Sequence, residues 1–160
     1  MIDVPAQKIR SKKSAHECFC LHFPEEEWPF HGGWGYSKDD AVVLDIEKDA
    51  FAVMFEPEFL EKRAIIETFF SQSKRSRCFG SKSRMLGQSL QCHDGKHYDV
   101  VTVEVTAIPF IFREELLKEY NDNNQFKDDR LGLEKYHKKM ESKMIRYKTE
   151  CWFDLSASWK

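Results

Sequence analysis

Hydrophobic and polar residues alternate most regularly in the middle of the chain. Across residues 101–106, valines take every second position, and threonine or glutamate takes the positions between them. This two-residue period is typical of a strand with one buried face. An Asp94-Gly95 pair interrupts the surrounding pattern and favours the left-handed backbone of a tight turn. The pattern therefore predicts a β-hairpin: strands Met85–Cys92 and His97–Ile108 joined by the turn His93–Lys96.

Four further segments have the short apolar runs or the alternation of strands. Ala41–Ile46 is a mostly apolar run, as in a buried strand. In His16–Phe23, apolar and polar residues alternate loosely until Pro24 ends the segment. Phe51–Phe55 is a plausible short strand, and in Tyr147–Leu155 apolar and polar residues alternate near the C-terminus. The sequence predicts one strand at each of these places.

Two segments in the last third of the chain are predicted to be helices. They are Phe112–Tyr120 and Leu131 to about Met144, the second dense in lysine and glutamate, with the polar loop Asn121–Asp128 between them. In residues 57–71 the apolar positions fit a helical stripe imperfectly, and the aromatic and β-branched content also suits a strand. That segment stays open between helix and strand. Ser37 is placed to cap a short turn through Asp40.

Length and composition indicate one domain over residues 1–160. With 160 residues and 41% hydrophobic content, the chain can bury one sizeable core. The predicted elements correspond to an α+β fold: a mainly antiparallel β-sheet with two or three helices packed on one face. Residues 1–14 are basic and rich in serine and lysine, so we expect a flexible N-terminal segment that frays or drapes over the surface.

Several features favour a cytoplasmic protein with reduced thiols. No apolar run approaches the roughly 18 residues of a membrane span, and the N-terminus lacks the apolar core of a signal peptide. The five cysteines are an odd set without a Cys-x-x-Cys motif, which fits small core residues better than a disulfide framework. We expect no membrane association.

Charge is separated along the chain although the net charge is only −2. Between Glu25 and Glu61 there are eleven acidic side chains and two lysines, whereas Ser71–Arg84 has five basic residues and no acid. An acidic surface steers a cationic partner toward it. This pattern favours binding over chemistry.

The segment between Glu25 and Tyr36 combines acids, glycines and aromatic rings, as an ordered recognition loop does. Carboxylates would steer the encounter and rings would form its desolvated centre. The alternative for the rings is core packing, which we prefer for Trp152. The predicted partner-binding residues are Glu25, Glu26, Glu27, Trp28, Trp34, Tyr36, Asp39 and Asp40.

Constellations that could support chemistry each have a simpler explanation. Cys18, Cys20 and His22 would share one face of a strand and, with Cys92, His93 or His97, supply zinc ligands, but the usual two-residue spacing is absent. His93 and His97 flank the hairpin turn and could act as acid and base, although turn histidines are usually solvated. The acidic clusters lack the ordered spacing of a metal-binding loop. We predict no metal, no cofactor and, since no nucleotide or nucleophile motif is present, no enzyme.

Three segments resemble a group of small bacterial proteins, the immunity proteins encoded beside polymorphic and contact-dependent inhibition toxins. They are Gly32–Tyr36 with Asp39–Asp45, the Asp94–Lys96 turn leading into Val103–Ala107, and Lys143–Tyr147 leading to Trp152–Asp154. The likeness spans most of Trp28–Leu155, and its motifs are structural, so no functional residue is carried over. It implies a cytosolic protein that binds and blocks the C-terminal domain of one cognate toxin, often a basic nuclease.

The basic segment 74–84 supports an alternative, an RNA-binding or RNA-processing protein. Lys74, Arg75, Arg77, Lys82 and Arg84 can neutralise phosphates. A basic loop that packs against the acidic segment of the same chain explains them equally well. For the immunity function we expect no direct contact with nucleic acid.

Overall fold

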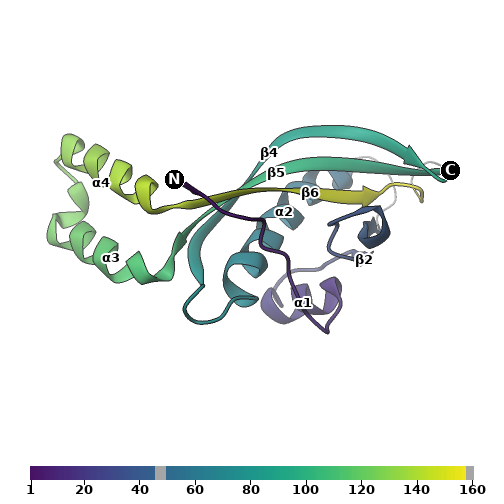
Figure 1. Ribbon diagram of the computed structural model, residues 1–160, viewed down its shortest axis with the longest axis horizontal. Coiled ribbons are helices and arrows are strands. Elements are labelled where there is room, and N and C mark those ends of the chain that lie inside the picture. The colour runs from purple at the N-terminus through teal and green to yellow at the C-terminus, as the bar shows by residue number, and fades with distance from the viewer. Residues whose placement is uncertain (46–49, 158–160) are drawn as a thin grey trace.

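The computed structural model describes residues 1–45 and 50–157, which form a mixed six-stranded sheet and four α-helices (Figure 1). The sheet order is β2-β3-β6-β5-β4, and a short strand β1 also pairs with β6. The strands are β1 (Ile2–Asp3), β2 (Phe30–Gly32), β3 (Val42–Leu44), β4 (Cys78–His93), β5 (Lys96–Pro109) and β6 (Ile145–Asp154). The predicted α+β class and single domain are confirmed.

The predicted hairpin is the longest feature of the sheet. Strands β4 and β5 pair antiparallel from Cys78 opposite Pro109 to His93 opposite Lys96. Asp94 and Gly95 form the turn with φ of 53° and 77°, the left-handed backbone that this dipeptide favours. β5 also pairs antiparallel with β6 over ten residue pairs. β3 and β1 join β6 in parallel, so the sheet is mixed rather than purely antiparallel.

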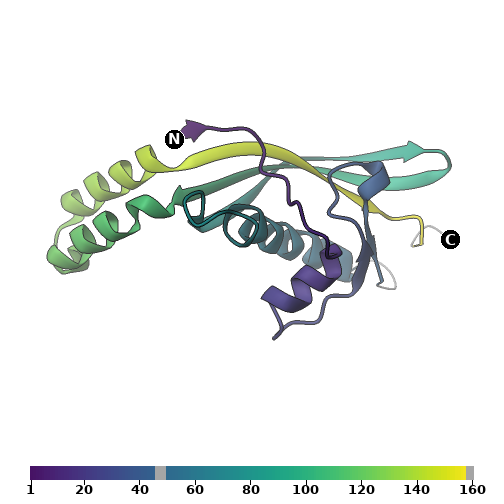
Figure 2. The same ribbon diagram turned by 60° about the horizontal axis from the view of Figure 1, so that its bottom comes forward.

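Helices α1 (Ala15–His22) and α2 (Ala50–Ile65) cover one face of this sheet (Figure 2). The main core lies between them and the strands, where Phe19 and Phe59 stack at 4.8 Å between ring centroids. The inward residues of β5, Val101, Val103 and Val105, close this core from the sheet side. Burial of these apolar side chains stabilises the fold.

Helices α3 (Arg113–Asp122) and α4 (Arg130–Lys143) form a hairpin beyond one end of the sheet (Figure 1). They confirm both predicted C-terminal helices. Leu116, Phe126 and Tyr136 form a second, smaller core with Ile108 of β5. Lys139 joins the two helices through carboxylates of Glu115 and Glu119 at 2.7 and 2.5 Å. None of the described helices is both long and apolar enough to span a membrane.

Two predicted strands are wrong. Residues 16–22 belong to α1, because Ser14 and Glu17 cap each other's backbone N–H groups and begin a helix there. Phe51–Phe55 lies within α2, so the strand assigned there is also wrong. The open segment 57–71 continues α2 and ends in the π-helical turn η2 (Ile66–Phe70).

Other local predictions, in the first 46 residues, agree more closely with the structure. The strand expected at Ala41–Ile46 is present as Val42–Leu44, and Ile46 lies outside the described residues. Lys38–Asp40 forms the short turn η1 with Ser37 at its N-terminal cap position, although the serine side chain makes no capping hydrogen bond. The first thirteen residues run along the domain: β1 adds to β6, and Ile9 is buried in the main core.

A buried ion pair joins α2 to η2. Arg63 and Glu67 are each only 1% exposed, and Arg63 Nε lies 3.1 Å from Glu67 Oε1. The hydroxyls of Tyr36 and Tyr147 donate to the two oxygens of Glu67 at 2.7 and 2.5 Å. Arg63 donates to the carbonyls of Trp34 and Glu150 at 2.8 and 2.9 Å. Both charges are thereby compensated, which a buried ion pair requires.

Removing one member of this pair should leave an uncompensated buried charge. We expect Arg63→Met to lower the free energy of unfolding by about 3–5 kcal/mol. The matched control is Arg130→Met in α4, where Arg130 and Glu134 have the same spacing but lie on the surface. That change should cost only about 0.3–0.5 kcal/mol. Urea unfolding measures both, and equal losses would contradict a central role for the buried pair.

Candidate binding surface

The two tryptophans predicted as exposed anchors are core residues. Trp28 is 5% and Trp34 8% exposed, and both rings contact Phe19 of α1. The indole N–H of Trp28 donates to the carbonyl of Phe23 at 3.1 Å, so its polar atom is also satisfied internally. The prediction that these rings form a surface anchor is therefore wrong, and core packing applies. They fix the 23–45 segment to the domain.

Tyr36, also predicted as an interface ring, serves the buried ion pair. Its hydroxyl donates to Glu67 and accepts the backbone N–H of Ile9 at 3.0 Å. Burial and the neighbouring Glu67 charge raise the pKa of Tyr36 far above its usual range, so the hydroxyl stays protonated. This residue thus links residues 32–36, which we call the glycine-rich loop, and the N-terminal segment to η2.

Asp40 closes the glycine-rich loop instead of facing a partner. Its carboxylate accepts the backbone N–H groups of Trp34 and Tyr36 at 3.2 and 3.3 Å. Gly35 has φ of +81°, and a Cβ at this position would lie 2.6 Å from Cys151 Sγ. The loop therefore needs glycine for both its backbone conformation and its close approach to β6.

Asp39 lies at a different place from Glu25–Glu27. Its neighbour Lys38 bonds to Asp94 in the β4–β5 turn at 3.3 Å, so η1 approaches the tip of that hairpin. Glu26 instead bonds to Lys62 on α2 at 2.5 Å. The predicted carboxylates thus divide between two locations: Asp39 and Asp40 lie on η1, and Glu25–Glu27 lie beside α2.

At that second location, glutamates from two distant segments meet. Glu58 forms a hydrogen bond with Glu26. Glu61 lies one helical turn further along α2, and its negative charge acts on the carboxyl group of Glu58. We define the acidic patch as Glu25, Glu26, Glu27, Glu58 and Glu61. Apart from the half-buried Glu26, these side chains are exposed.

Charge within the acidic patch is only partly neutralised. The hydrogen bond from Lys62 lowers the pKa of Glu26. The hydrogen bond to Glu26, partial burial and the charges of Glu26 and Glu61 raise the pKa of Glu58. A raised carboxyl pKa is the response expected where negative charges crowd together. Lys62 also lies 4.7 Å from the ring centroid of Phe23, which holds this cation beside Glu26.

A second pair of acids is buried between α2 and the sheet. Glu56 on α2 and Asp99 on β5 are both buried and hydrogen bonded to each other, and Gln88 of β4 donates to Asp99. Burial and the adjacent Asp99 charge raise the pKa of Glu56 to about 7. Two such carboxyl groups share a proton because both cannot ionise readily at close range. The pair fastens α2 to β4 and β5 when Glu56 is protonated.

The arrangements considered for catalysis or zinc are not assembled. His93 pairs with Lys96 and His97 with Cys92 in adjacent rows of the hairpin, so the two histidines face opposite sides of the sheet. Cys18 is buried and Cys20 exposed because they lie on a helix, not a strand. Within residues 1–45 and 50–157, no three His, Cys, Asp or Glu side chains are arranged to hold a metal ion.

Comparison with known proteins found no matching family model, no matching curated protein and no matching solved structure.

Sequence reasoning missed Glu58 and Glu61 as partners of the Glu25–Glu27 segment. Their i,i+3 spacing places them near one another on a helix, and this signal was readable. The spacing is informative only if residues 57–71 are helical, and their apolar pattern fits a strand as well as a helix. The approach of α2 to the 23–29 loop depends on tertiary packing and has no local signal.

Gly35 gives a direct test of the loop geometry. We expect Gly35→Ala to lower the free energy of unfolding by about 2–5 kcal/mol, from left-handed strain and the clash with Cys151. The control is Gly80→Ala, where φ is +61° but a Cβ meets no atom within 4 Å. That variant should lose only about 1–2 kcal/mol. Chemical denaturation of both proteins separates the clash from the strain, and equal losses would exclude a clash at Gly35.

The Glu56–Asp99 pair predicts a pH dependence of stability. The folded-state pKa of Glu56, about 7, lies above the ordinary glutamate pKa of 4.5, so the folded state holds an extra proton between these values. Stability from Glu56 is complete below pH 4.5 and is lost as pH rises through about 7. Thermal unfolding from pH 4.5 to 8 should show a smaller loss in Glu56→Gln than in the parent. Identical profiles would contradict the shared proton.

Proposed function

We propose that this protein is a non-catalytic immunity protein that neutralises a basic toxin domain by covering its active site. The observation that supports this proposal is the acidic patch, where five glutamates from two segments are held on a rigid support. Trp28 anchors the loop side of this support in the core, and α2 provides the other side. A nuclease must attract a polyphosphate, so carboxylates presented at this density compete for the same basic cleft.

An apolar residue beside the acidic patch can replace the buried tryptophans as an anchor. Met54 is 74% exposed and lies one helical turn before Glu58 on α2. Methionine is flexible and adapts to irregular partner surfaces. Affinity in such interfaces comes from a few desolvated side chains, while surrounding charges set the association rate. The acidic patch would steer the toxin, and Met54 would contribute to the contact it forms.

The immunity proposal predicts that a toxin is encoded beside the gene for this protein, and this toxin is the appropriate probe. Expression of its C-terminal domain in a test bacterium should arrest growth. Co-expression of this protein should restore growth. The purified proteins should form a 1:1 complex without toxin activity. Absence of a complex at micromolar concentrations would reject the immunity proposal.

Charge reversal tests the position of the interface. We expect Glu25→Lys, Glu27→Lys and Glu58→Lys together to slow association about tenfold or more at low salt, and to weaken its salt dependence, because steering is lost. The matched control reverses three exposed acids on the α3–α4 hairpin, Asp122, Asp128 and Glu141. Stopped-flow or surface-plasmon kinetics would measure both sets. An equal effect of the control set would place the interface elsewhere.

A further inference from the structure

A second charged surface lies near η2, and the immunity proposal does not use it. Its cations come from three segments: the N-terminal segment, the turn that follows η2, and the start of α3. None of them forms an ion pair with a carboxylate in the described part of the chain, whereas Lys82 of the same basic segment lines a pocket together with Glu61 of α2. These cations are Lys8, Arg10, Lys74, Arg75, Arg77 and Arg113.

The N-terminal segment and the turn after η2 meet at a shallow hollow of about 380 Å³. Lys8 and Arg10 line it from one side, and Ser71 and Gln72 line it from the other. No carboxylate contributes to this lining. The Gln72 side chain is held in place because its amide donates to the carbonyl of Glu67 at 2.7 Å. Lys74 and Arg75 follow directly in the chain, so positive charge continues from the hollow onto the turn.

Aromatic rings extend this surface toward α3. Phe70 and Phe110 are 39% and 40% exposed, unusually open for phenylalanine. Phe69 lies between them, with ring centroids 5.1 Å from Phe70 and 6.2 Å from Phe110. The rings are therefore a continuous group, and we call them, with the six cations, the aromatic–basic surface.

Guanidinium groups are already placed against these rings. Arg77 lies 5.0 Å from the centroid of Phe69, and Arg113 lies 5.5 Å from that of Phe110. The backbone N–H of Phe110 donates to the carbonyl of Arg77 at 2.8 Å, which fixes the two segments together. Arg77 Nε is buried and has no hydrogen-bond partner among the described residues. Rings and cations thus alternate across one surface.

We propose that the aromatic–basic surface binds single-stranded nucleic acid. Cations that follow a path across a surface neutralise successive phosphates, and exposed rings between them stack on unpaired bases. A duplex keeps its bases stacked inside, where these rings cannot reach them. An acidic peptide would use the cations but has no need of flat exposed rings. The combination therefore favours a single strand.

The same geometry predicts weak sequence preference. Phe70 stacks on His22 at 3.9 Å between ring centroids, and the exposed parts of the rings are apolar surface that any base can contact, while the cations contact only phosphate. Phe23 contacts Phe70 at 6.3 Å between ring centroids and also lies beneath Lys62 beside the acidic patch. A polyanion would therefore extend from Phe70 toward Phe110 and Arg113, away from those glutamates. This proposal revises the expectation of no nucleic-acid contact and does not depend on the immunity function.

Fluorescence anisotropy with a labelled twelve-nucleotide uridine RNA tests the proposal. We expect a Kd in the micromolar range at 50 mM NaCl. The logarithm of the affinity should fall linearly with the logarithm of the salt concentration, with a slope of about −0.7 for each contacted phosphate. Lys74→Glu with Arg75→Glu should weaken binding and flatten this slope. Phe70→Leu and Phe110→Leu keep apolar bulk but lose the flat ring. Each should weaken binding about fivefold or more without changing the slope.

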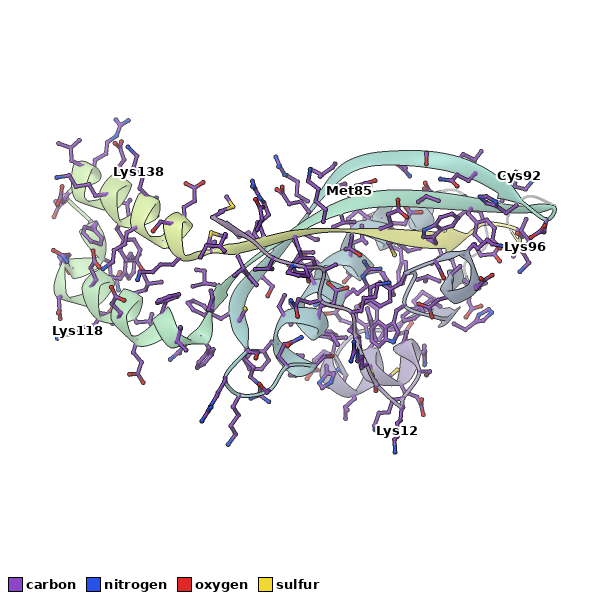
Figure 3. The ribbon with its side chains drawn as sticks, viewed as in Figure 1. Lys12, Met85, Cys92, Lys96, Lys118 and Lys138 are labelled. Atoms are coloured by element: carbon purple, nitrogen blue, oxygen red, sulfur yellow. The ribbon has the colours of Figure 1, made fainter. Side chains whose placement is uncertain are left out.

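The control replaces Lys118 and Lys138 with glutamate, which makes the same change of charge on the α3–α4 hairpin (Figure 3). This variant should bind the RNA nearly as the parent does. A twelve-base-pair duplex and a polyglutamate peptide serve as competing probes, and both should bind more weakly than the single strand. Absence of RNA binding, a duplex or polyglutamate bound as tightly, or an equal effect of the control pair would overturn the proposal. Thermal unfolding of each variant verifies that it remains folded.

Discussion

The buried Arg63–Glu67 pair is the interaction on which the arrangement of the other segments depends. It lies where α2 passes into η2, and its hydrogen-bonding groups come from the glycine-rich loop and β6, while Ile9 of the N-terminal segment joins through Tyr36. Such a charge pair cannot be buried unless nearly all its donors and acceptors are satisfied. Each of these segments must therefore be in place before the ion pair is stable. The network couples parts of the chain that have no local reason to meet.

This constraint explains how the glycine-rich loop is held in place. Tyr36 is fixed by Glu67, the carbonyl of Trp34 accepts from Arg63, and Asp40 satisfies the backbone between them. The residues that resemble a recognition loop in the sequence are thus used to close the core. In the proposed function, the neighbouring carboxylates would contact the partner, and this base would hold them in position at low entropic cost.

Two surfaces of opposite charge meet near the C-terminal end of η2. The acidic patch lies on the 25–27 segment and α2, and the aromatic–basic surface continues through η2 toward α3. Phe23 and Phe70 separate them with aromatic contacts. The separation of charge seen along the chain thus persists in space, because the two segments lie on either side of this aromatic boundary. A net charge of −2 does not reveal it.

The sequence by itself determined the elements whose signals are local. The Asp94-Gly95 turn and the valine alternation specify the β4–β5 hairpin, and dense lysine and glutamate patterns specify α3 and α4, because neighbours in the chain create these preferences. Ser14 and Glu17 also encoded the start of α1, although the apolar alternation suggested a strand. Only the tertiary structure decided that Trp28 and Trp34 are buried and that Glu58 joins Glu26. Those outcomes depend on how α2 packs against a distant loop, and no residue pattern within either segment predicts that packing.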